Sequence, residues 1–402
     1  MRVLFLNPVA RLGGAEQSLV DLLTCLAGRV ELGLLTFEDG PLVQIARGLG
    51  VRTSTLVFPE SLMRLGDFGE GGALTPLLKF LTRSSPGEIT GLVRRFRAAV
   101  SEFGPDIVHS NGIKTHLLSG AAVPGKSKLV WHVRDFLGNR RLVRRVIPAL
   151  AGRVSAAFAI SGAVERDLRA LLPTLPVAVV YNAVDLERFR PRSPEGSFLD
   201  ELSGLPAAEE GVVRIGLVAT YARWKGHRLF LEAAADASKR SPVPLRFYVI
   251  GGPIYFGAAS QITEEDLRVW IHEFGLGGRV GVVPFLEAAE RAFNSLDIAV
   301  NANIAPEPFG RTVVEAMASG VPVVSGSSVG ALEDVPALSL EKLPVLSATT
   351  LSAALVSLAA NPGRRRELST LGLEAARRYS RQRLAERVLT LYRCLRAASG
   401  QG

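Results

Sequence analysis

The sequence has few cysteines and lacks the spaced side chains that usually bind metal ions. Cys25 and Cys394 are its only cysteines, and they lie near opposite ends of the 402 residues. Two such cysteines form neither a disulfide framework nor a zinc site, and they are typical of a reducing compartment. An Asp-x-Asp pair, an H-E-x-x-H motif and clusters of His and Cys are also missing. We therefore expect no metal site.

The sequence also lacks a long uninterrupted apolar run. Its most apolar stretch, residues 146–164, contains Pro148, Gly152 and Arg153, whereas a membrane-spanning helix needs about 20 consecutive apolar residues. The apolar start of the chain, Arg2–Leu6, is short, and no cleavage site of a secretory signal follows it. We expect a cytoplasmic protein.

Acidic residues are fewer than basic residues, so the formal net charge is +9. The basic residues gather in three clusters, which are Arg94, Arg95 and Arg97; Arg134, Arg140, Arg141, Arg144 and Arg145; and Arg364, Arg365 and Arg366. No zinc-finger or RNP signature accompanies them, which argues against nucleic-acid binding. Two interpretations remain open, namely solvated helix faces and peripheral contact with an anionic membrane surface.

Short apolar runs alternate with helical stretches along the chain, a pattern typical of βαβ units and parallel sheets. In the first half the expected strands are Arg2–Leu6, Glu31–Thr36, Asp106–His109, Lys128–His132, Ala156–Ile160 and Ala178–Tyr181. In the second half they are Val213–Val218, Leu245–Gly251, Val280–Val283, Ile298–Val300 and Pro322–Ser325. Helices are expected between them, for example at 16–26, 88–102, 226–239, 263–275, 311–319 and 350–360.

This pattern predicts an α/β protein with two consecutive doubly wound, Rossmann-like halves. The expected division is an N-terminal domain 1–190, a linker 191–210 rich in turn residues, a C-terminal domain 211–375 and a C-terminal helix within 376–402 that packs back on the first domain. Residues 60–90 are broken by Gly and Pro and are interpreted as an insertion that faces an acceptor. Since ligands bind beyond the carboxyl ends of parallel strands, we expect the site in a cleft between the halves.

The most specific local pattern runs from Pro306 to Val324, where a loop with Pro and Gly opens a helix, Gly320 closes it and an apolar strand follows. The start of such a helix offers unpaired N–H groups and a positive dipole to a diphosphate. Glu315, inside the helix, is suited to accept hydrogen bonds from ribose hydroxyls, and Glu307, in the loop, from a sugar. Spacing alone favours the plainer interpretation of a surface glutamate beside an ordinary helix.

This segment resembles the Glu-x7-Glu motif of the glycosyltransferase family 4 enzymes, which have the GT-B fold. Glu307 and Glu315 fall on the two glutamates, within the context Glu-Ala-Met-Ala-Ser-Gly-Val-Pro-Val-Val. Tyr181–Phe189 is similar to the Asn-Gly-Val-Asp turn of the family, and Met1–Leu6 with Gly13-Gly14-Ala15-Glu16 to its first strand and glycine loop. Four matches in the right order extend over nearly the whole chain.

The resemblance assigns roles around a diphosphate. Lys225, in Ala222-Arg223-Trp224-Lys225-Gly226, falls on the lysine that neutralises the leaving group, a contact that strengthens in the transition state. An arginine is usual five positions earlier, but this chain has Thr220 there, and Arg223 is a candidate substitute. Gly13 and Gly14 let backbone N–H groups approach a phosphate. The residues Phe309, Gly310, Arg311 and Thr312 are further donor-binding candidates.

The remaining candidates follow expected strands. His132 resembles the family histidine near the donor sugar, with a hydrogen bond to a sugar hydroxyl as its expected task; a satisfied core histidine is the alternative. His109 and Asn111 are weaker acceptor candidates. The loops with Gly251 and Gly252 and with Pro284 are expected to frame the nucleobase.

One match is interpreted as accidental. Residues 120–127 satisfy G-x-x-x-x-G-K-S, the phosphate-binding loop of NTPases. That loop needs a preceding strand and a following helix, whereas here 114–123 is predicted as helix and 128–132 as strand.

The resemblance implies a metal-independent, retaining glycosyltransferase without a cofactor, whose donor is a UDP- or GDP-sugar. The expected acceptor is a glycan, a lipid-linked sugar or a small molecule, in cell-envelope or polysaccharide biosynthesis, and nucleic acid is not an expected partner. A UDP-sugar 2-epimerase of the same fold remains an alternative. An NAD-dependent two-domain oxidoreductase is disfavoured because the dinucleotide fingerprint is incomplete, and a non-catalytic nucleotide-sugar sensor is a third alternative.

Overall fold

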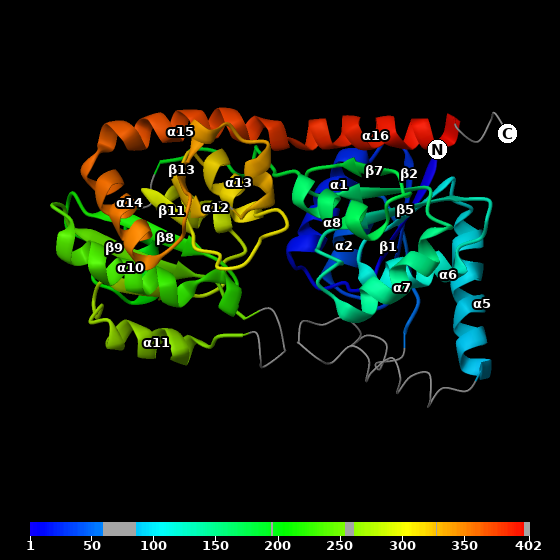
Figure 1. The fold of residues 1–402 in the computed structure, drawn as a ribbon, viewed down its shortest axis with the longest axis horizontal. Helices are drawn as coiled ribbons and strands as arrows, with labels where there is room; N and C mark the ends of the chain where they lie inside the picture. Colours follow the sequence, from blue (N-terminus) through cyan, green and yellow to red (C-terminus); the bar gives the residue numbers. More distant parts are fainter. Residues whose placement is uncertain (59–85, 194–195, 254–260, 327, 398–402) are drawn as a thin grey trace. The chain divides into compact units, whose positions relative to one another are not determined.

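The computed structural model describes the chain except for residues 59–85, 194–195, 254–260, 327 and 398–402. It divides into two α/β units, shown in Figure 1: Met1–Ala183 with Arg381–Gly402, and Val184–Ser380. The division falls before the expected boundary at residue 190, and residues 376–380 belong to the second unit. Two successive α/β units agree with the predicted fold class.

The first unit contains a seven-stranded parallel sheet in the order β3-β2-β1-β4-β5-β6-β7. Its strands are β1 (Arg2–Asn7), β2 (Glu31–Thr36), β3 (Arg52–Thr55), β4 (Ile107–Ser110), β5 (Lys128–Val133), β6 (Ala156–Ala159) and β7 (Val177–Val179). The order reverses between β1 and β4, and such a switch point is where doubly wound sheets bind ligands beyond the strand ends.

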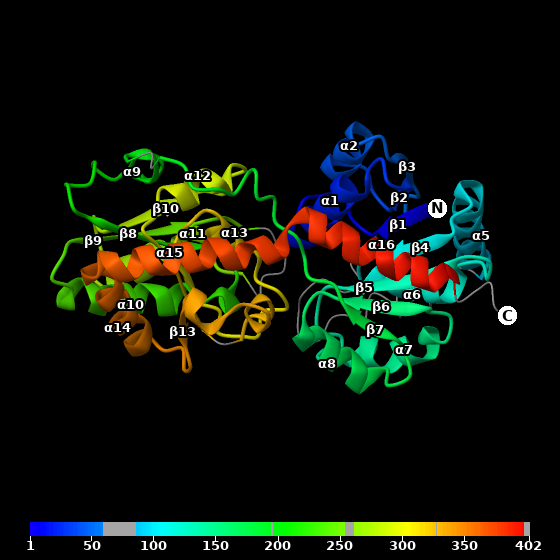
Figure 2. The same ribbon diagram turned by 90° about the horizontal axis from the view of Figure 1, so that it is seen from above.

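Both faces of this sheet are buried, which explains its continuous apolar strands. Val3 and Phe5 of β1 belong to a core shared with α1 (Gly14–Leu26), α2 (Pro41–Gly48) and the C-terminal helix α16 (Arg381–Ala397). On the other face, Trp131 of β5 stacks on His116 of α6 (Ile113–Ala122). Figure 1 shows α1 and α16 side by side, and Figure 2 shows α16 running over the strands β4 and β5.

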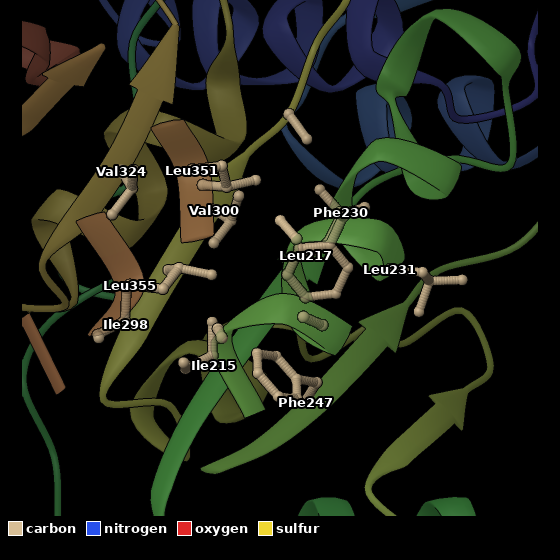
Figure 3. Close-up of a cluster of buried hydrophobic side chains, with 14 of the residues drawn as sticks. Ile215, Leu217, Phe230, Leu231, Phe247, Ile298, Val300, Val324, Leu351 and Leu355 are labelled. Atoms are coloured by element: carbon tan, nitrogen blue, oxygen red, sulfur yellow. The ribbon is translucent and has the colours of Figure 1, made fainter. Parts of the chain in front are cut away.

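The second unit contains a six-stranded parallel sheet in the order β10-β9-β8-β11-β12-β13. Its strands are β8 (Val213–Val218), β9 (Leu245–Ile250), β10 (Val280–Val283), β11 (Ile298–Asn301), β12 (Val323–Gly326) and β13 (Glu341–Leu343). The switch point here lies between β8 and β11. Figure 3 shows Ile215 and Leu217 of β8 clustered with Phe230 of α10 (His227–Arg240) and Leu355 of α14 (Ala348–Ala360).

The remaining helices flank these two sheets. They are α5 (Pro86–Phe103), α7 (Arg141–Ala151), α8 (Gly162–Leu171), α9 (Phe198–Ser203), α11 (Glu264–Glu273), α12 (Ala289–Asn294), α13 (Arg311–Ala318) and α15 (Pro362–Ala376). The predicted strands and helices recur within a few residues, whereas β3, β13 and α15 were not predicted. The expected insertion 60–90 lies largely outside the described residues.

The segment expected as a linker contains a helix. Residues 198–203 form α9, whose Asp200 accepts hydrogen bonds from Tyr248 Oη (2.5 Å) and Arg246 Nη1 (2.8 Å) of β9. Asp200 is buried, and its pKa is below the ordinary value: burial alone would raise it, but the bonds from Tyr248, Arg246 and the Ala208 N–H outweigh that effect. α9 is therefore an integral part of the second unit.

Membrane-spanning helices and metal-ligand clusters were searched for among the described residues. No helix there is both long enough and apolar enough to span a bilayer, and no three His, Cys, Asp or Glu side chains there gather as metal ligands. In the G-x-x-x-x-G-K-S segment, α6 precedes β5, so this segment has the opposite order to a nucleotide-binding loop.

Candidate functional site

In the second unit, the candidate residues come from the loops on the two sides of the switch point. The chain leaves β8 through Thr220 and the 3-10 turn η1 (Arg223–Lys225), and it leaves β11 through Asn303 toward Glu307. Because β8 and β11 are parallel neighbours, both loops start at the carboxyl edge of the sheet. This is the edge where doubly wound sheets bind ligands.

Lys225 and Glu307 meet at this edge. The ammonium group of Lys225 donates to Glu307 Oε2, and Asn303 Nδ2 donates to the same oxygen at 2.6 Å. The side chains of Lys225 and Glu307 are only 18% and 17% exposed. Such charge-assisted bonds fix both groups, and without a ligand the carboxylate neutralises the lysine.

The backbone brings these two loops into close contact. The N–H group of Ile304 donates to the carbonyl of Trp224 at 2.9 Å. Gly226, which follows Lys225, has φ of +72°, and a Cβ atom there would overlap the carbonyl oxygen of Ala302. Only glycine combines this backbone conformation with such an approach. The position of Lys225 next to Gly226 is therefore set by the fold.

The second glutamate lies on α13. Glu315 is 8% exposed and pairs with Arg311 Nη2 at 3.1 Å, one helical turn earlier. Phe309 is buried against Tyr379, and the next residue, Gly310, has φ of +91° and precedes α13 without a side-chain cap. In the first turn the N–H group of Val313 donates to the Gly310 carbonyl at 3.1 Å, and that of Thr312 is one of the N–H groups that an α-helix leaves without an intrahelical acceptor. A Cβ atom at Gly310 would lie 3.6 Å from Glu307 Cγ, so the start of α13 presents its positive dipole end beside Glu307.

The other donor candidates lie at the same edge. Gly251 and Gly252 follow β9, where the Gly251 N–H group donates to Val283 and the Gly252 carbonyl accepts from Tyr221, both at 3.0 Å. Pro284 follows β10 and is exposed. Arg223 is exposed in η1, near the Asp266 carboxylate, whose pKa it helps to lower after the hydrogen bonds from Thr263.

In the first unit, the glycine loop follows β1 at the switch point. Gly13 is the N-cap of α1, and its N–H group donates to Glu16 Oε2 at 3.2 Å. Gly14 is exposed, has an ordinary helical backbone, and a Cβ atom there would meet nothing within 4 Å. The fold therefore does not require glycine at position 14, and close approach of a ligand would explain it.

A chain of polar side chains connects this loop with the ends of β4 and β5. Asn7 donates to Glu16 (3.3 Å) and accepts from Asn111 (2.6 Å). Arg134, directly after β5, donates to Asn111 Oδ1 and, at 2.6 Å, to Asn182 Oδ1. The pKa of Glu16 is above its ordinary value, because burial raises it by more than the bond from Asn7 and the charge of Arg134 lower it.

Two histidines lie beside these hydrogen-bonded polar side chains. His109 of β4 and His132 of β5 are fully buried, and His109 Nε2 lies 3.0 Å from His132 Nδ1. Their pKa values are far below the ordinary value because of burial first and the Arg134 charge second. Both imidazoles are therefore neutral at physiological pH, which suits hydrogen bonding better than proton uptake.

The candidates thus form two groups, one per unit. The sequence analysis missed Asn7, Arg134 and Asn303 as members of these groups. A signal existed, since each is a polar residue at or just after the end of a buried strand. Their partners come from other strands, so pairing was not visible along the chain.

Comparison with known proteins decides the family. Residues 12–188 match the model of glycosyltransferase family 4, and residues 206–368 match that of the group 1 glycosyl transferases. The chain belongs to this glycosyltransferase family. The two matches confirm the resemblance inferred from the Glu-x7-Glu segment and the glycine loop, and they place the candidate residues within family domains.

Curated relatives and solved structures agree with this assignment. D-inositol 3-phosphate glycosyltransferase of Corynebacterium urealyticum is 28% identical over 234 residues, 56% of this chain and 53% of that protein. The enzyme of the same name from Rhodococcus erythropolis is 30% identical over 54% of this chain and 48% of its own length. The chain spans about half the length of these relatives.

Solved structures are similar over nearly the whole chain. Anabaena HepE in complex with UDP has a TM-score of 0.77 at 21% identity, covering 97% of this chain and 99% of HepE. Sucrose-phosphate synthase of Thermosynechococcus elongatus has a TM-score of 0.73 at 19% identity, covering 99% of each chain. At such identities the likeness shows the fold, and it confirms GT-B.

Proposed function

We propose that this protein is a metal-independent, retaining glycosyltransferase that takes its sugar from a nucleoside diphosphate. The observation that carries the proposal is the placement of two ion pairs, Lys225–Glu307 and Arg311–Glu315, near the start of α13 at the carboxyl edge of the second sheet. This edge offers two cations and helix N–H groups for a diphosphate, and two carboxylates for hydroxyls.

The second unit is proposed to hold the donor. Lys225 and the first turn of α13 would bind the diphosphate, Glu315 the ribose and Glu307 the transferred sugar. As the bond between the anomeric carbon and the diphosphate oxygen breaks, negative charge grows on that oxygen, and a fixed cation stabilises it. The acceptor hydroxyl would form the new bond on the same face and pass its proton to the leaving phosphate oxygen, which retains the configuration.

A uridine nucleotide is the first donor to test. HepE, whose fold this chain shares, has been solved in complex with UDP-glucose. The comparison of that structure with this chain gives a TM-score of 0.75 at 22% identity. The base would lie at the loops of Gly251, Gly252 and Pro284, which follow the carboxyl ends of β9 and β10. A GDP-sugar remains the second donor to test.

The first unit is proposed to bind the acceptor through the region of Asn111, His132 and Arg134. A hydroxyl-bearing sugar, lipid-linked glycan or polyol phosphate suits this polar edge, and the curated relatives are named for D-inositol 3-phosphate. Arg141, Arg144 and Arg145 are exposed on α7, which supports a peripheral contact with anionic lipid at the cytoplasmic face during cell-envelope or polysaccharide synthesis.

Thermal stabilisation by a panel of UDP-, GDP- and ADP-sugars tests the donor. A ligand at a hundred times its Kd stabilises the folded state by about 2.7 kcal/mol, so one nucleotide class should raise the Tm clearly. Product analysis with that donor, with and without acceptors, then separates transfer from epimerisation. Absence of stabilisation by every nucleotide sugar, or an epimerised donor as the product, contradicts the proposal.

A further inference from the structure

Three buried side chains of the first unit form one continuous chain of hydrogen bonds. The Tyr392 hydroxyl of α16 lies 2.5 Å from His109 Nδ1, and His109 Nε2 lies 3.0 Å from His132 Nδ1. All three side chains are at most 1% exposed. The chain therefore joins the C-terminal helix to the end of β5, where the acceptor is proposed to bind.

The protonation state of each of the three side chains is fixed. Burial lowers the pKa values of His109 and His132, and it raises that of Tyr392, so the imidazoles are neutral and the phenol keeps its proton. A neutral imidazole has one N–H donor and one bare nitrogen acceptor, and a phenol donates one proton. The direction of one bond therefore determines the direction of the next.

Only two directions are self-consistent. If Tyr392 donates to His109 Nδ1, His109 donates through Nε2 to His132 Nδ1, and His132 carries its proton on Nε2. In the reverse direction, Tyr392 accepts from His109, His109 accepts from His132, and His132 Nε2 is bare. The reverse direction leaves the phenol proton without an acceptor, because His109 is the hydrogen-bond partner of Tyr392 among the described residues.

The hydrogen-bond series ends at His132 Nε2, and this atom is unsatisfied in either direction. His132 Nε2 is buried and has no hydrogen-bond partner among the described residues. The forward direction leaves one polar group unpaired, this Nε2–H, whereas the reverse leaves two, the phenol proton and the bare Nε2. Because unpaired buried polar groups cost free energy, the forward direction is favoured, and the chain ends in an N–H donor.

We propose that Tyr392 and His109 are positioning residues that hold His132 in the tautomer with its proton on Nε2, so that His132 donates a hydrogen bond to an oxygen of the bound substrate. Naming a sugar oxygen as the acceptor rests on the proposed function. The tautomer itself rests only on the geometry. The C-terminal helix, far from the motifs in sequence, thereby sets the polarity of a side chain at the end of β5.

Nitrogen-15 NMR of the histidine side chains in the free, full-length protein tests the tautomer directly. The chain has five histidines, so the spectrum is small and can be assigned with single His→Gln variants. In the unmodified protein we expect His109 and His132 both with the proton on Nε2. A proton on Nδ1 of His132 overturns the proposal, whatever any variant does.

The variant Tyr392→Phe removes the donor without changing the ring, and His132 should shift toward the Nδ1–H tautomer. Tyr248→Phe is the matched control, because it removes another buried tyrosine hydroxyl, 2.5 Å from Asp200 in the second unit. The histidine signals should not change in the control. An unchanged His132 tautomer in Tyr392→Phe overturns the proposal.

Turnover separates positioning from stability. Loss of one oriented hydrogen bond in the transition state corresponds to about a tenfold lower kcat, which we expect for Tyr392→Phe with an unchanged donor KM, and not for Tyr248→Phe. Equal kcat in the two variants overturns the catalytic part. If the unmodified protein turns over no nucleotide sugar, the proposed function fails, while NMR still decides the tautomer.

Discussion

Lys225 and Glu307 are 82 positions apart in the sequence and form an ion pair at the switch point of the second sheet. Lys225 comes from the loop after β8 and Glu307 from the loop after β11. The proposed roles assign these groups to different parts of the donor, the diphosphate and the sugar. A bound diphosphate would then have to compete with Glu307 for the ammonium group.

This competition gives an unusual prediction for Glu307→Gln. Removal of the carboxylate charge frees Lys225, so the Glu307→Gln variant should bind UDP alone more tightly than the unmodified protein does, by several-fold for a part-buried charge pair. Turnover should nevertheless fall, because the transferred sugar loses a charged acceptor. Calorimetric titration with UDP and initial rates measure the two effects. Weaker UDP binding would show that the pair does not compete with the ligand.

Lys225→Ala should lower kcat by about a hundredfold or more, the scale of one lost transition-state charge contact. Lys239→Ala is the control, since Lys239 is an exposed lysine on α10 of the same unit. Initial rates at saturating donor are the measurement. If Lys225→Ala retains near-normal turnover with a folded spectrum, Lys225 does not stabilise the leaving group.

Much of the fold was predictable because its central strands are buried on both faces. Such strands are apolar runs, as in β1 and β8, and they are visible without periodicity. The edge strands β3 and β13 were not predicted, since Arg52–Thr55 contains no apolar residue and Glu341–Leu343 is short and mostly charged. α15 was missed because arginines and glutamates obscure its apolar spacing.

The site was predictable only one residue at a time. Lys225 and Glu307 follow strands and His132 lies near the end of β5, each in a recognisable motif, so the sequence pointed to them as candidates one at a time. Their partners depend on which strands are neighbours. The contact between Tyr392 and His109 spans 283 positions, and a buried tyrosine on an amphipathic helix is indistinguishable in sequence from ordinary core.

Gly14 and Gly226 should respond differently to alanine. Gly226 has a left-handed backbone and touches the Ala302 carbonyl, so Gly226→Ala should destabilise the second unit and lower the Tm. At Gly14 a Cβ atom meets open space, and Gly14→Ala should leave the Tm unchanged or slightly raised. If a ligand approaches this backbone, Gly14→Ala should still reduce turnover. Unchanged Tm and unchanged rate together would remove position 14 from the site.

Asp200 should make the second unit sensitive to acid. Its folded-state pKa is lowered despite burial, by bonds from Tyr248, Arg246 and the Ala208 N–H. A lowered pKa means that the stabilisation is fully present above the unfolded pKa of about 4 and is lost as the pH falls through the folded value. Asp200→Asn should therefore destabilise by about 3 kcal/mol at neutral pH, the scale of a broken buried charge network.

The difference in unfolding free energy between Asp200→Asn and the unmodified protein should stay constant from pH 7 to about 5 and shrink below about 4. Urea titrations at several pH values measure it. Glu264→Gln is the control, because the Glu264 carboxylate is exposed on α11 and pairs with Arg268 one turn along the helix; such pairs contribute about 0.3–0.5 kcal/mol. If the Asp200 difference grew toward acid pH, the carboxylate would be protonated in the folded state, and the bonds from Tyr248 and Arg246 would not be holding its charge.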